Sequence, residues 1–307
     1  MTTLKLFASF VLAAAIVSTL SAETRCPGNV ASLPVRQVQS TAIVIPVEVN
    51  QSGPYDFMVD TGAQVTSIDS SLAAELHLKP QSVVGVTGAA TYARGGLVNL
   101  DRLQAGTQVV EGSPAVTIDI ALSGIQDRRV RGILGGSFLE HFDVLIDNRR
   151  HLMCLDDTDA MASAIRGERI PLAEPYGPQT DLPFTRPIEV SARLSATAPT
   201  PILLRLDSGS NVPALYSTYK WRRPASLQQI QQFKRMAYGI EQDFALLAPQ
   251  ELRIGRSGSM DVSFVIPLNQ VGNGGPTPRE DGVLPTLAYQ RVFISCKGGY
   301  AVLQAWD

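Results

Sequence analysis

The sequence predicts an all-β protein made of two lobes that repeat one another, with a few short helices. Two observations carry this prediction. Apolar stretches rich in β-branched and aromatic residues recur along the chain, and a short motif around Asp60 returns around Asp207. Gly, Pro, Asn or Ser bound the apolar stretches, which is the pattern of strands separated by turns. A chain of 307 residues is long enough for two such lobes.

The repeat extends well beyond the two aspartates. Upstream, "PVEVN" (46–50) resembles "PIEVS" (187–191), and each is followed by a polar turn and an apolar strand that ends in the aspartate. Downstream, Gly132 opens "GILGGSFLEHFDVLIDNRRHLMCL" and Gly282 opens "GVLPTLAYQRVFISCKGGYAVL". The spacing from Asp to Gly is 72 residues in the first half and 75 in the second. The same order at similar spacing indicates two copies of one structural unit.

The domain organisation follows from the repeat and from changes in composition. The segment 156–187 contains five prolines and several acidic residues, which is typical of a linker rather than of core. Short helices are expected at 71–78, 137–141 and 285–290, and a longer polar helix at 226–237 as a surface insertion. The predicted parts are a signal peptide (1–22), an N-terminal segment (23–40), a first lobe (41–155), the linker (156–183) and a second lobe (184–307).

The first 22 residues have the layout of a secretory signal peptide. Lys5 precedes an apolar run over residues 6–17, and small residues follow, so we expect cleavage near Ala22. The alternative is a membrane anchor, but the run is shorter than the ~18 apolar residues that a spanning helix needs. We therefore expect an exported protein, periplasmic or secreted, with no stable membrane insertion after cleavage.

Composition excludes several other classes. The formal net charge is -2 and no long basic run occurs, so nothing indicates a nucleic-acid partner. Cys26, Cys154 and Cys296 allow one disulfide with one thiol left over, and the pairing stays open. The cysteine spacing fits no zinc motif and the three histidines form no ligand pattern, so we predict no metal and no cofactor.

Two copies of apolar-apolar-Asp-Thr/Ser-Gly, each followed by apolar-apolar-Gly in a later strand, resemble the motifs of the aspartic proteases. They stand here as "MVDTGA" with "GILGG", and as "LRLDSGS" with "GVLP". Each repeat, of about a hundred residues, is similar to the compact retropepsin-like lobe. The resemblance covers residues 41–155 and 184–303. It implies a bilobed, pepsin-like architecture with two retropepsin-like lobes in one chain.

The resemblance implies an aspartic endopeptidase with Asp60 and Asp207 as its catalytic dyad. Two carboxylates brought close together cannot both ionise comfortably, so they share a proton. One then acts as general base on a water and the other as general acid on the carbonyl oxygen. Such an enzyme acts on polypeptides, and we expect a monomer because both aspartates lie on one chain.

The neighbours of the two aspartates have roles in this family. Thr61 and Ser208 carry hydroxyls that hydrogen-bond across the lobe interface. Gly62 and Gly209 let backbone pass close to the carboxylates, where a Cβ would intrude.

The position after each glycine differs between the repeats, since residue 63 is Ala and residue 210 is Ser. A Ser210 hydroxyl that donated to the adjacent carboxylate would favour its ionised form. We therefore expect Asp207 to ionise more readily than Asp60.

Two stretches are candidates for a substrate flap. Residues 83–96 lie where retropepsin-like lobes place a flap hairpin, with Gly85, Thr87 and Gly88 at the expected tip. In the second lobe Tyr238 and Gly239 fall at the similar place. The alternative for both is an ordinary surface hairpin.

Arg205 is the clearest departure from the family pattern. It stands two residues before Asp207, where the first repeat has Met58, and residues two apart share one face of a strand. An Arg205 that faced the dyad would hold both carboxylates ionised and suppress proton sharing.

Two alternatives to a single-chain enzyme stay open. One is a non-catalytic peptide-binding protein with a protease-like fold, because fold alone does not imply function. The other is a homodimeric protease formed by the first lobe, with a regulatory second lobe. An Asp207→Asn variant separates this homodimer from the single-chain enzyme, since a single-chain dyad loses activity and a first-lobe dimer keeps it.

Overall fold

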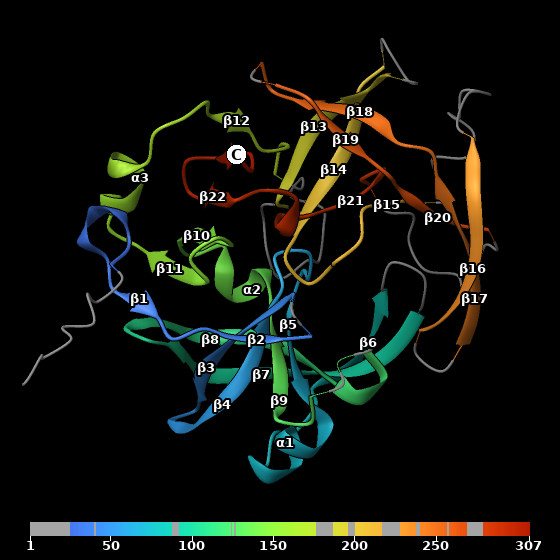
Figure 1. Ribbon diagram of the computed structural model, residues 1–307. Helices are drawn as coiled ribbons and strands as arrows, with labels where there is room; N and C mark the ends of the chain where they lie inside the picture. The colour runs from blue at the N-terminus through green and yellow to red at the C-terminus, as the bar shows by residue number, and fades with distance from the viewer. Residues whose placement is uncertain are drawn as a thin grey trace, which may run out of the picture.

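The structure is a computed structural model. It describes residues 25–39, 41–87, 92–123, 125, 127–175, 187–195, 200–216, 228–237, 240–256, 258–268 and 279–307. The predicted signal peptide and three of the proposed flap residues (Gly88, Tyr238 and Gly239) lie outside these residues. Three sheets with short helices make up the described part, so the prediction of an all-β fold is confirmed (Figure 1).

The first half of the chain forms an eight-stranded sheet, in the order β2-β3-β4-β9-β5-β8-β7-β6. An additional pairing between β3 and β7 makes this sheet curl back on itself. Its strands are β2 (Arg36–Val38), β3 (Ala42–Val49), β4 (Ser52–Val59), β5 (Thr66–Asp69), β6 (Ser82–Thr87), β7 (Tyr92–Ala105), β8 (Gln108–Ile118) and β9 (Val130–Leu134).

The second half forms a nine-stranded sheet, in the order β16-β17-β20-β15-β21-β14-β13-β18-β19. Its strands are β13 (Glu189–Leu194), β14 (Ile202–Asp207), β15 (Ala214–Leu215), β16 (Gln229–Ala237), β17 (Ile240–Leu247), β18 (Gln250–Ile254), β19 (Met260–Val262), β20 (Val265–Pro267) and β21 (Gly282–Pro285).

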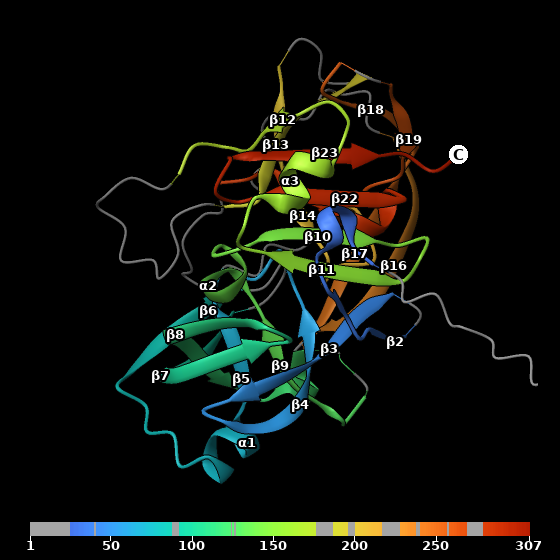
Figure 2. The same ribbon diagram turned by 90° about the vertical axis from the view of Figure 1, so that its left-hand side faces the viewer.

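A third sheet is shared by the two halves, in the order β1-β11-β10-β22-β23-β12. Its centre is the antiparallel pair β10–β22, in which Leu145 lies opposite Phe293. Figure 2 shows β10, β11, β22 and β23 of this sheet above the first-half sheet. The strands are β1 (Ser32–Leu33), β10 (Asp143–Asp147), β11 (Leu152–Asp156), β12 (Ile170–Pro171), β22 (Arg291–Ser295) and β23 (Tyr300–Gln304).

The helices are short. Within the described residues they include α1 (Ser70–Glu75), α2 (Gly136–Leu139), α3 (Ala160–Ala164) and 3-10 turns at Pro27–Asn29, Ile120–Ser123 and Thr286–Ala288. Helical turns thus occur at 71–78, 137–141 and 285–290, as predicted, although each is shorter. Helix α3 and strand β12 lie inside the segment predicted to be a linker. That segment is partly core, because the Met161 side chain is fully buried and Ile170 extends the shared sheet.

The helix predicted at 226–237 is wrong, because residues 229–237 form strand β16. Its Gln, Lys, Arg and Met residues favour a helix by intrinsic propensity, but tertiary pairing overrides such preferences. The strand pairs antiparallel with β17, and Phe233 stacks on Phe244 directly opposite, with ring centroids 5.8 Å apart. The hairpin lies at the edge of the nine-stranded sheet (Figure 1).

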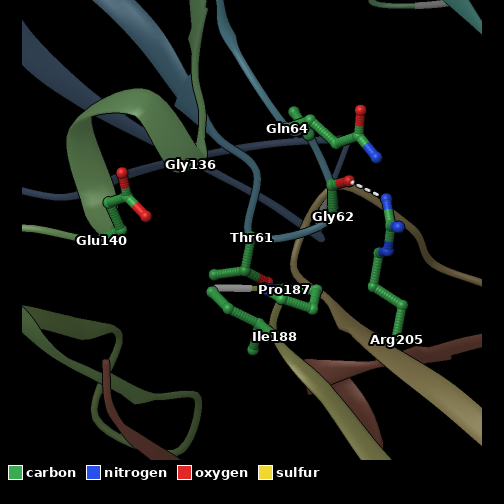
Figure 3. Close-up of a pocket in the computed structure, with 9 residues that line it drawn as sticks. Thr61, Gly62, Gln64, Gly136, Glu140, Pro187, Ile188 and Arg205 are labelled. Carbon is green, nitrogen blue, oxygen red and sulfur yellow. Dashed lines mark hydrogen bonds between the residues drawn. The ribbon is translucent and has the colours of Figure 1, made fainter. Parts of the chain in front are cut away.

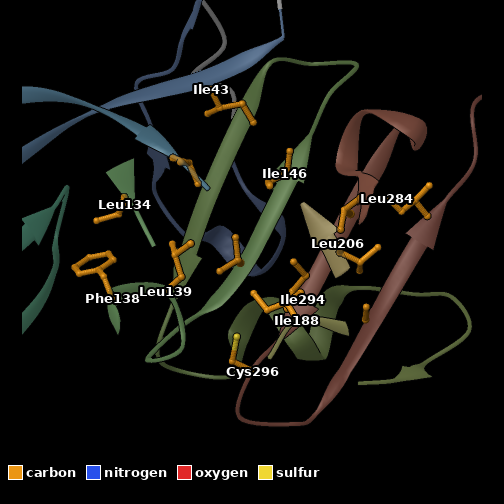
Figure 4. Packing of buried hydrophobic residues seen from close by; sticks show 14 of the residues in the cluster. Ile43, Leu134, Phe138, Leu139, Ile146, Ile188, Leu206, Leu284, Ile294 and Cys296 are labelled. Carbon is orange, nitrogen blue, oxygen red and sulfur yellow. The ribbon is translucent and has the colours of Figure 1, made fainter. Parts of the chain in front are cut away.

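One apolar core runs through both halves. Leu134 and Ile146 of the first half belong to the same buried cluster as Leu206 and Leu284 of the second (Figure 4). The shared sheet contributes residues such as Ile294 to this cluster. The two halves therefore bury apolar surface against each other, which is the dominant favourable contribution to folding.

The N-terminal segment is fastened to two sheets. Strand β1 pairs with β11, β2 pairs with β3, and a disulfide joins Cys26 to Cys154. This answers the open pairing, since Cys296 is buried and outside the disulfide. Residues 32–33 and 36–38 of this segment are thus used for sheet pairing.

Candidate active site

The same strand arrangement presents both aspartates. In the first half β4 runs parallel to β9, with Val59 opposite Leu134, and β9 is antiparallel to β5. In the second half β14 runs parallel to β21, with Leu206 opposite Leu284, and β21 is antiparallel to β15. Asp60 follows the end of β4, and Asp207 is the last residue of β14. The repeat seen in the sequence is therefore a repeat in strand topology.

The glycines that open the second motif of each repeat allow close packing. A Cβ on Gly132 would lie 2.2 Å from Cε1 of Phe57, and a Cβ on Gly282 would lie 2.1 Å from the carbonyl oxygen of Ala214. Neither position has room for a side chain. The motif thus packs its strand tightly against β4 in the first half and against β15 in the second.

A reciprocal set of hydrogen bonds joins the two aspartate turns. The Thr61 hydroxyl donates to the Leu206 carbonyl (2.7 Å) and accepts from the Ser208 N–H (3.0 Å). The Ser208 hydroxyl donates to the Val59 carbonyl (2.8 Å) and accepts from the Thr61 N–H (3.0 Å). Both side chains are buried. Each hydroxyl thus satisfies two backbone groups of the opposite half, which holds the turns in register.

The two carboxyl groups meet over the glycines of these turns. A Cβ on Gly62 would lie 2.5 Å from Cγ of Asp207, and a Cβ on Gly209 would lie 2.5 Å from Cγ of Asp60. The structure therefore brings together all six residues predicted at the centre of the site: Asp60, Thr61, Gly62, Asp207, Ser208 and Gly209.

Each carboxylate is cradled by backbone N–H groups of its own turn. Asp60 Oδ1 accepts from Gly62 (2.8 Å) and Ala63 (3.1 Å), and Asp207 Oδ1 accepts from Gly209 (2.8 Å) and Ser210 (2.8 Å). These donors favour the ionised form of either group. The two cradles are equivalent in their first contacts.

Burial nevertheless raises the pKa of both aspartates. Burial and then the charge of Asp60 raise the pKa of Asp207 to about 8. Burial also raises the pKa of Asp60, while its backbone donors and a hydrogen bond from Asp207 act in the opposite direction. The pair therefore retains one proton at neutral pH.

The predicted role of Ser210 is wrong. Its hydroxyl donates to the Val212 carbonyl (3.0 Å) rather than to a carboxylate. A hydroxyl has one proton to donate, so it cannot also favour ionised Asp207. The expectation that Asp207 ionises more readily than Asp60 loses this support, and burial raises the pKa of both carboxyl groups.

Residues 45–138 match the family model described as aspartyl protease. The match includes the turn of Asp60 and the glycines at 132–136, and it ends before the second half. Residues 45–138 form an aspartyl protease domain.

Among solved structures, the chain is similar to a retropepsin-like aspartic protease from Rickettsia conorii. The alignment has 21% sequence identity and a TM-score of 0.31, and it covers 41% of this chain and 90% of that chain. No curated protein matches the chain significantly.

The aspartyl protease domain receives a charged contact from the second half through Arg205. Its guanidinium donates to the Gly62 carbonyl (2.8 Å) across the interface (Figure 3). The same guanidinium forms ion pairs with Glu280 (2.8 Å) and Glu189 (3.3 Å). Arg205 thus binds two glutamates and the first turn, and its charge also acts to lower the pKa of both aspartates.

Three further residues near the dyad were missed by sequence reasoning. Tyr216 follows β15, and burial and then the charge of Glu280 raise its pKa. The charges of Asp60 and Asp207 also act on Tyr216, so it lies within electrostatic reach of the dyad. The sequence could have indicated Glu189, because it is an acidic residue inside an apolar strand. The sequence around Glu280 and Tyr216 has no such pattern.

The proposed flap of the aspartyl protease domain coincides with a hairpin. Gly85 and Thr87 lie on β6, which pairs antiparallel with β7 up to the pair Thr87 and Tyr92. In the second half, β16 and β17 flank residues 238 and 239. Both stretches are thus hairpin arms in the described residues, and their tips lie outside them.

A small pocket opens beside the first turn. Residues of the first turn, helix α2 and strand β14 line it, together with Pro187 and Ile188 just before β13 (Figure 3). Within the residues that the structure describes, no group of three or more His, Cys, Asp and Glu side chains is arranged to hold a metal ion. In the same residues, no helix has the length and apolar character that a membrane span requires.

Proposed function

We propose that this protein is an aspartic endopeptidase that hydrolyses peptide bonds with a water activated by Asp60 and Asp207 of one chain. The observation that carries the proposal is the close approach of the two carboxyl groups on turns tied by reciprocal Thr61 and Ser208 hydrogen bonds. The aspartyl protease domain at 45–138 supports a polypeptide as the substrate.

The chemistry needs one carboxylate and one carboxylic acid. The carboxylate takes a proton from water as the water oxygen bonds to the scissile carbonyl carbon, and the acid gives its proton to the carbonyl oxygen. The tetrahedral intermediate then loses the amine as the C–N bond breaks. The amine takes the proton gained from water, and the other carboxyl group recovers its own. Neither a metal nor a covalent intermediate takes part in these steps.

Two observations favour catalysis over peptide binding alone. Both aspartates are present, and the raised pKa of Asp207 keeps one proton on the pair at neutral pH. Arg205, which would suppress proton sharing if paired with the dyad, has Glu189 and Glu280 as its ion-pair partners. The pair therefore keeps the protonation state that the reaction requires.

The hairpin β6–β7, with Gly85 and Thr87 on one arm, is proposed as the flap over the substrate. We also propose that the protein is exported and acts as a monomer. The disulfide between Cys26 and Cys154 supports export, because such bonds persist in oxidising compartments.

Cleavage of a mixed peptide library from pH 3 to 9 tests this proposal, with wild type and Asp60→Asn run side by side. We expect cleavage by wild type, a loss of about 10³-fold or more in Asp60→Asn, and a fall in wild-type cleavage above pH 8 as Asp207 loses its proton. Failure of folded wild type to cleave any peptide would favour the peptide-binding alternative.

A further inference from the structure

Arg205 marks a difference between the two halves beside the dyad, since the first half has Met58 at the corresponding position. Its side chain is 11% exposed and lies between Glu189 and Glu280 of its own half and the carbonyl oxygen of Gly62. Arginine can serve all three because its guanidinium carries five donors in a fixed plane. Figure 3 shows the side chain reaching from β14 to the first turn.

The contact with Gly62 reaches Asp60 through a single peptide group. The Gly62 carbonyl and the Ala63 N–H belong to one planar amide, and this N–H donates to Asp60 Oδ1 (3.1 Å). A cationic donor on the carbonyl end polarises the amide and strengthens the hydrogen bond made by its N–H end. Arg205 thus contacts the peptide group whose N–H donates to Asp60 Oδ1, a hydrogen bond that favours ionised Asp60.

The second turn cannot receive the equivalent contact from the first half. Met58 occupies the position that corresponds to Arg205, opposite Ile133 in the parallel pair. Its side chain has no hydrogen-bond donor, and it is buried in an apolar cluster with Val44. The N–H of Ser210 therefore donates to Asp207 without a cation from that position behind its amide.

The charge of Arg205 is balanced locally. Glu189 also accepts two bonds from Arg279, at 3.0 and 2.8 Å. Burial raises the pKa of Glu280, which Arg205 opposes. Besides the dyad, the titratable and charged groups that face Arg205 or line its pocket among the described residues include Glu140, Glu189, Tyr216, Arg279 and Glu280.

We propose that Arg205 is a positioning residue that holds the Gly62–Ala63 peptide against Asp60, so that Asp60 is the general base and Asp207 keeps the proton and acts as the general acid. The inference rests on the proposed peptidase function and assigns the two roles within it. Asp60 takes the proton of the attacking water and passes it to the leaving amine. Asp207 gives its proton to the carbonyl oxygen and recovers it when the C–N bond breaks.

The pH profile of kcat/KM tests this assignment, because its acidic limb reports the pKa of the general base. We expect Arg205→Met to move this limb to higher pH by about half a unit or more, with kcat about 10-fold lower and a smaller change in KM. Arg205→Lys keeps the charge, but one ammonium cannot reach the glutamates and Gly62 together. We therefore expect a shift in the same direction.

Arg279→Met is the matched control. It removes an equal charge from the same Glu189, and Arg279 also donates to the Glu174 carbonyl. We expect the acidic limb to stay where it is in wild type.

Three outcomes would overturn the role of Arg205. The first is an acidic limb of the pH profile at the wild-type position in folded Arg205→Met, and the second is the same result in Arg205→Lys. The third is an equal shift of the acidic limb in Arg279→Met, which would show a general charge effect. If Arg205→Met does not fold, Arg205→Lys decides alone. Absence of activity in wild type would instead overturn the proposed function, so the two failures are distinguishable.

Discussion

At the scale of single residues, the absence of a side chain at two glycines allows the two aspartates to lie close together. Gly62 and Gly209 bring backbone so close that a Cβ on either would lie 2.5 Å from the Cγ of the opposite aspartate. The Thr61 and Ser208 hydroxyls then supply hydrogen-bond partners to backbone groups of the opposite turn. The site therefore depends on residue types that fit at these positions, and on very few others.

Thr61→Ala should lower stability and activity together. The change leaves the Leu206 carbonyl and the Ser208 N–H without their side-chain partner, at about 1–3 kcal/mol for each buried group. We expect a melting temperature several degrees lower and reduced peptide turnover, measured by calorimetry and peptide cleavage.

Thr61→Ser is the control, because it keeps the hydroxyl and removes only a methyl group. A Thr61→Ala protein as stable as Thr61→Ser would contradict the role assigned to these hydrogen bonds.

The sequence predicted the six central residues of the site but only part of their surroundings. Two Asp-Thr/Ser-Gly motifs in a repeat determine a symmetric pair, because each motif is local. The partners of Arg205 are not local: Glu189 comes from the neighbouring strand and Glu280 lies 75 residues downstream. The sequence could show that Arg205 shares a strand face with Asp207, but not which charges neutralise it.

At the scale of elements, pairing rather than propensity determined where prediction failed. Residues 229–237 read as a helix but form a strand because β17 pairs along them. The predicted linker contains α3 and β12 because the shared sheet offers β23 as a partner. Strand β12 depends on a partner far away in sequence and β16 on the second strand of its own hairpin, whereas the strands that end in Asp60 and Asp207 carry their own pattern.

Strand β10 contains two buried aspartates that should respond oppositely to substitution. Asp143 lies opposite Asp156 in the sheet. Burial raises the pKa of Asp143, a hydrogen bond from Ser295 acts to lower this pKa, and the charge of Asp156 raises it further. An acid whose pKa is raised on folding destabilises the protein as pH rises above its unfolded value, here 3.8. Asp143→Asn should therefore raise the melting temperature at pH 7, by an amount that shrinks towards pH 3.

Asp147→Asn is the matched comparison on the same strand. Asp147 accepts two bonds from Arg291, at 3.0 and 2.7 Å, so its loss should destabilise by about 1–3 kcal/mol at pH 7. Thermal unfolding of both variants at pH 7 and pH 3 measures the contrast. A destabilised Asp143→Asn protein at pH 7 would show that the Asp143 charge is not strained by its surroundings.

At the scale of the whole molecule, the second half completes what the first half begins. The shared sheet joins β10 to β22, and one apolar core crosses both halves. The turn of Asp207 lies opposite the turn of Asp60. In this arrangement each chain carries both members of the dyad. A dimer of the first halves would need Asp207 and its turn to move away from Asp60.

The activity of Asp207→Asn tests this central claim most directly. The variant should be purified with wild type and Asp60→Asn, checked for equal folding and mass in solution, and assayed on a peptide that wild type cleaves. We predict that Asp207→Asn loses about 10³-fold or more in kcat/KM, as Asp60→Asn does. An Asp207→Asn protein that keeps wild-type activity while Asp60→Asn is inactive would contradict the single-chain dyad and assign catalysis to the first half alone.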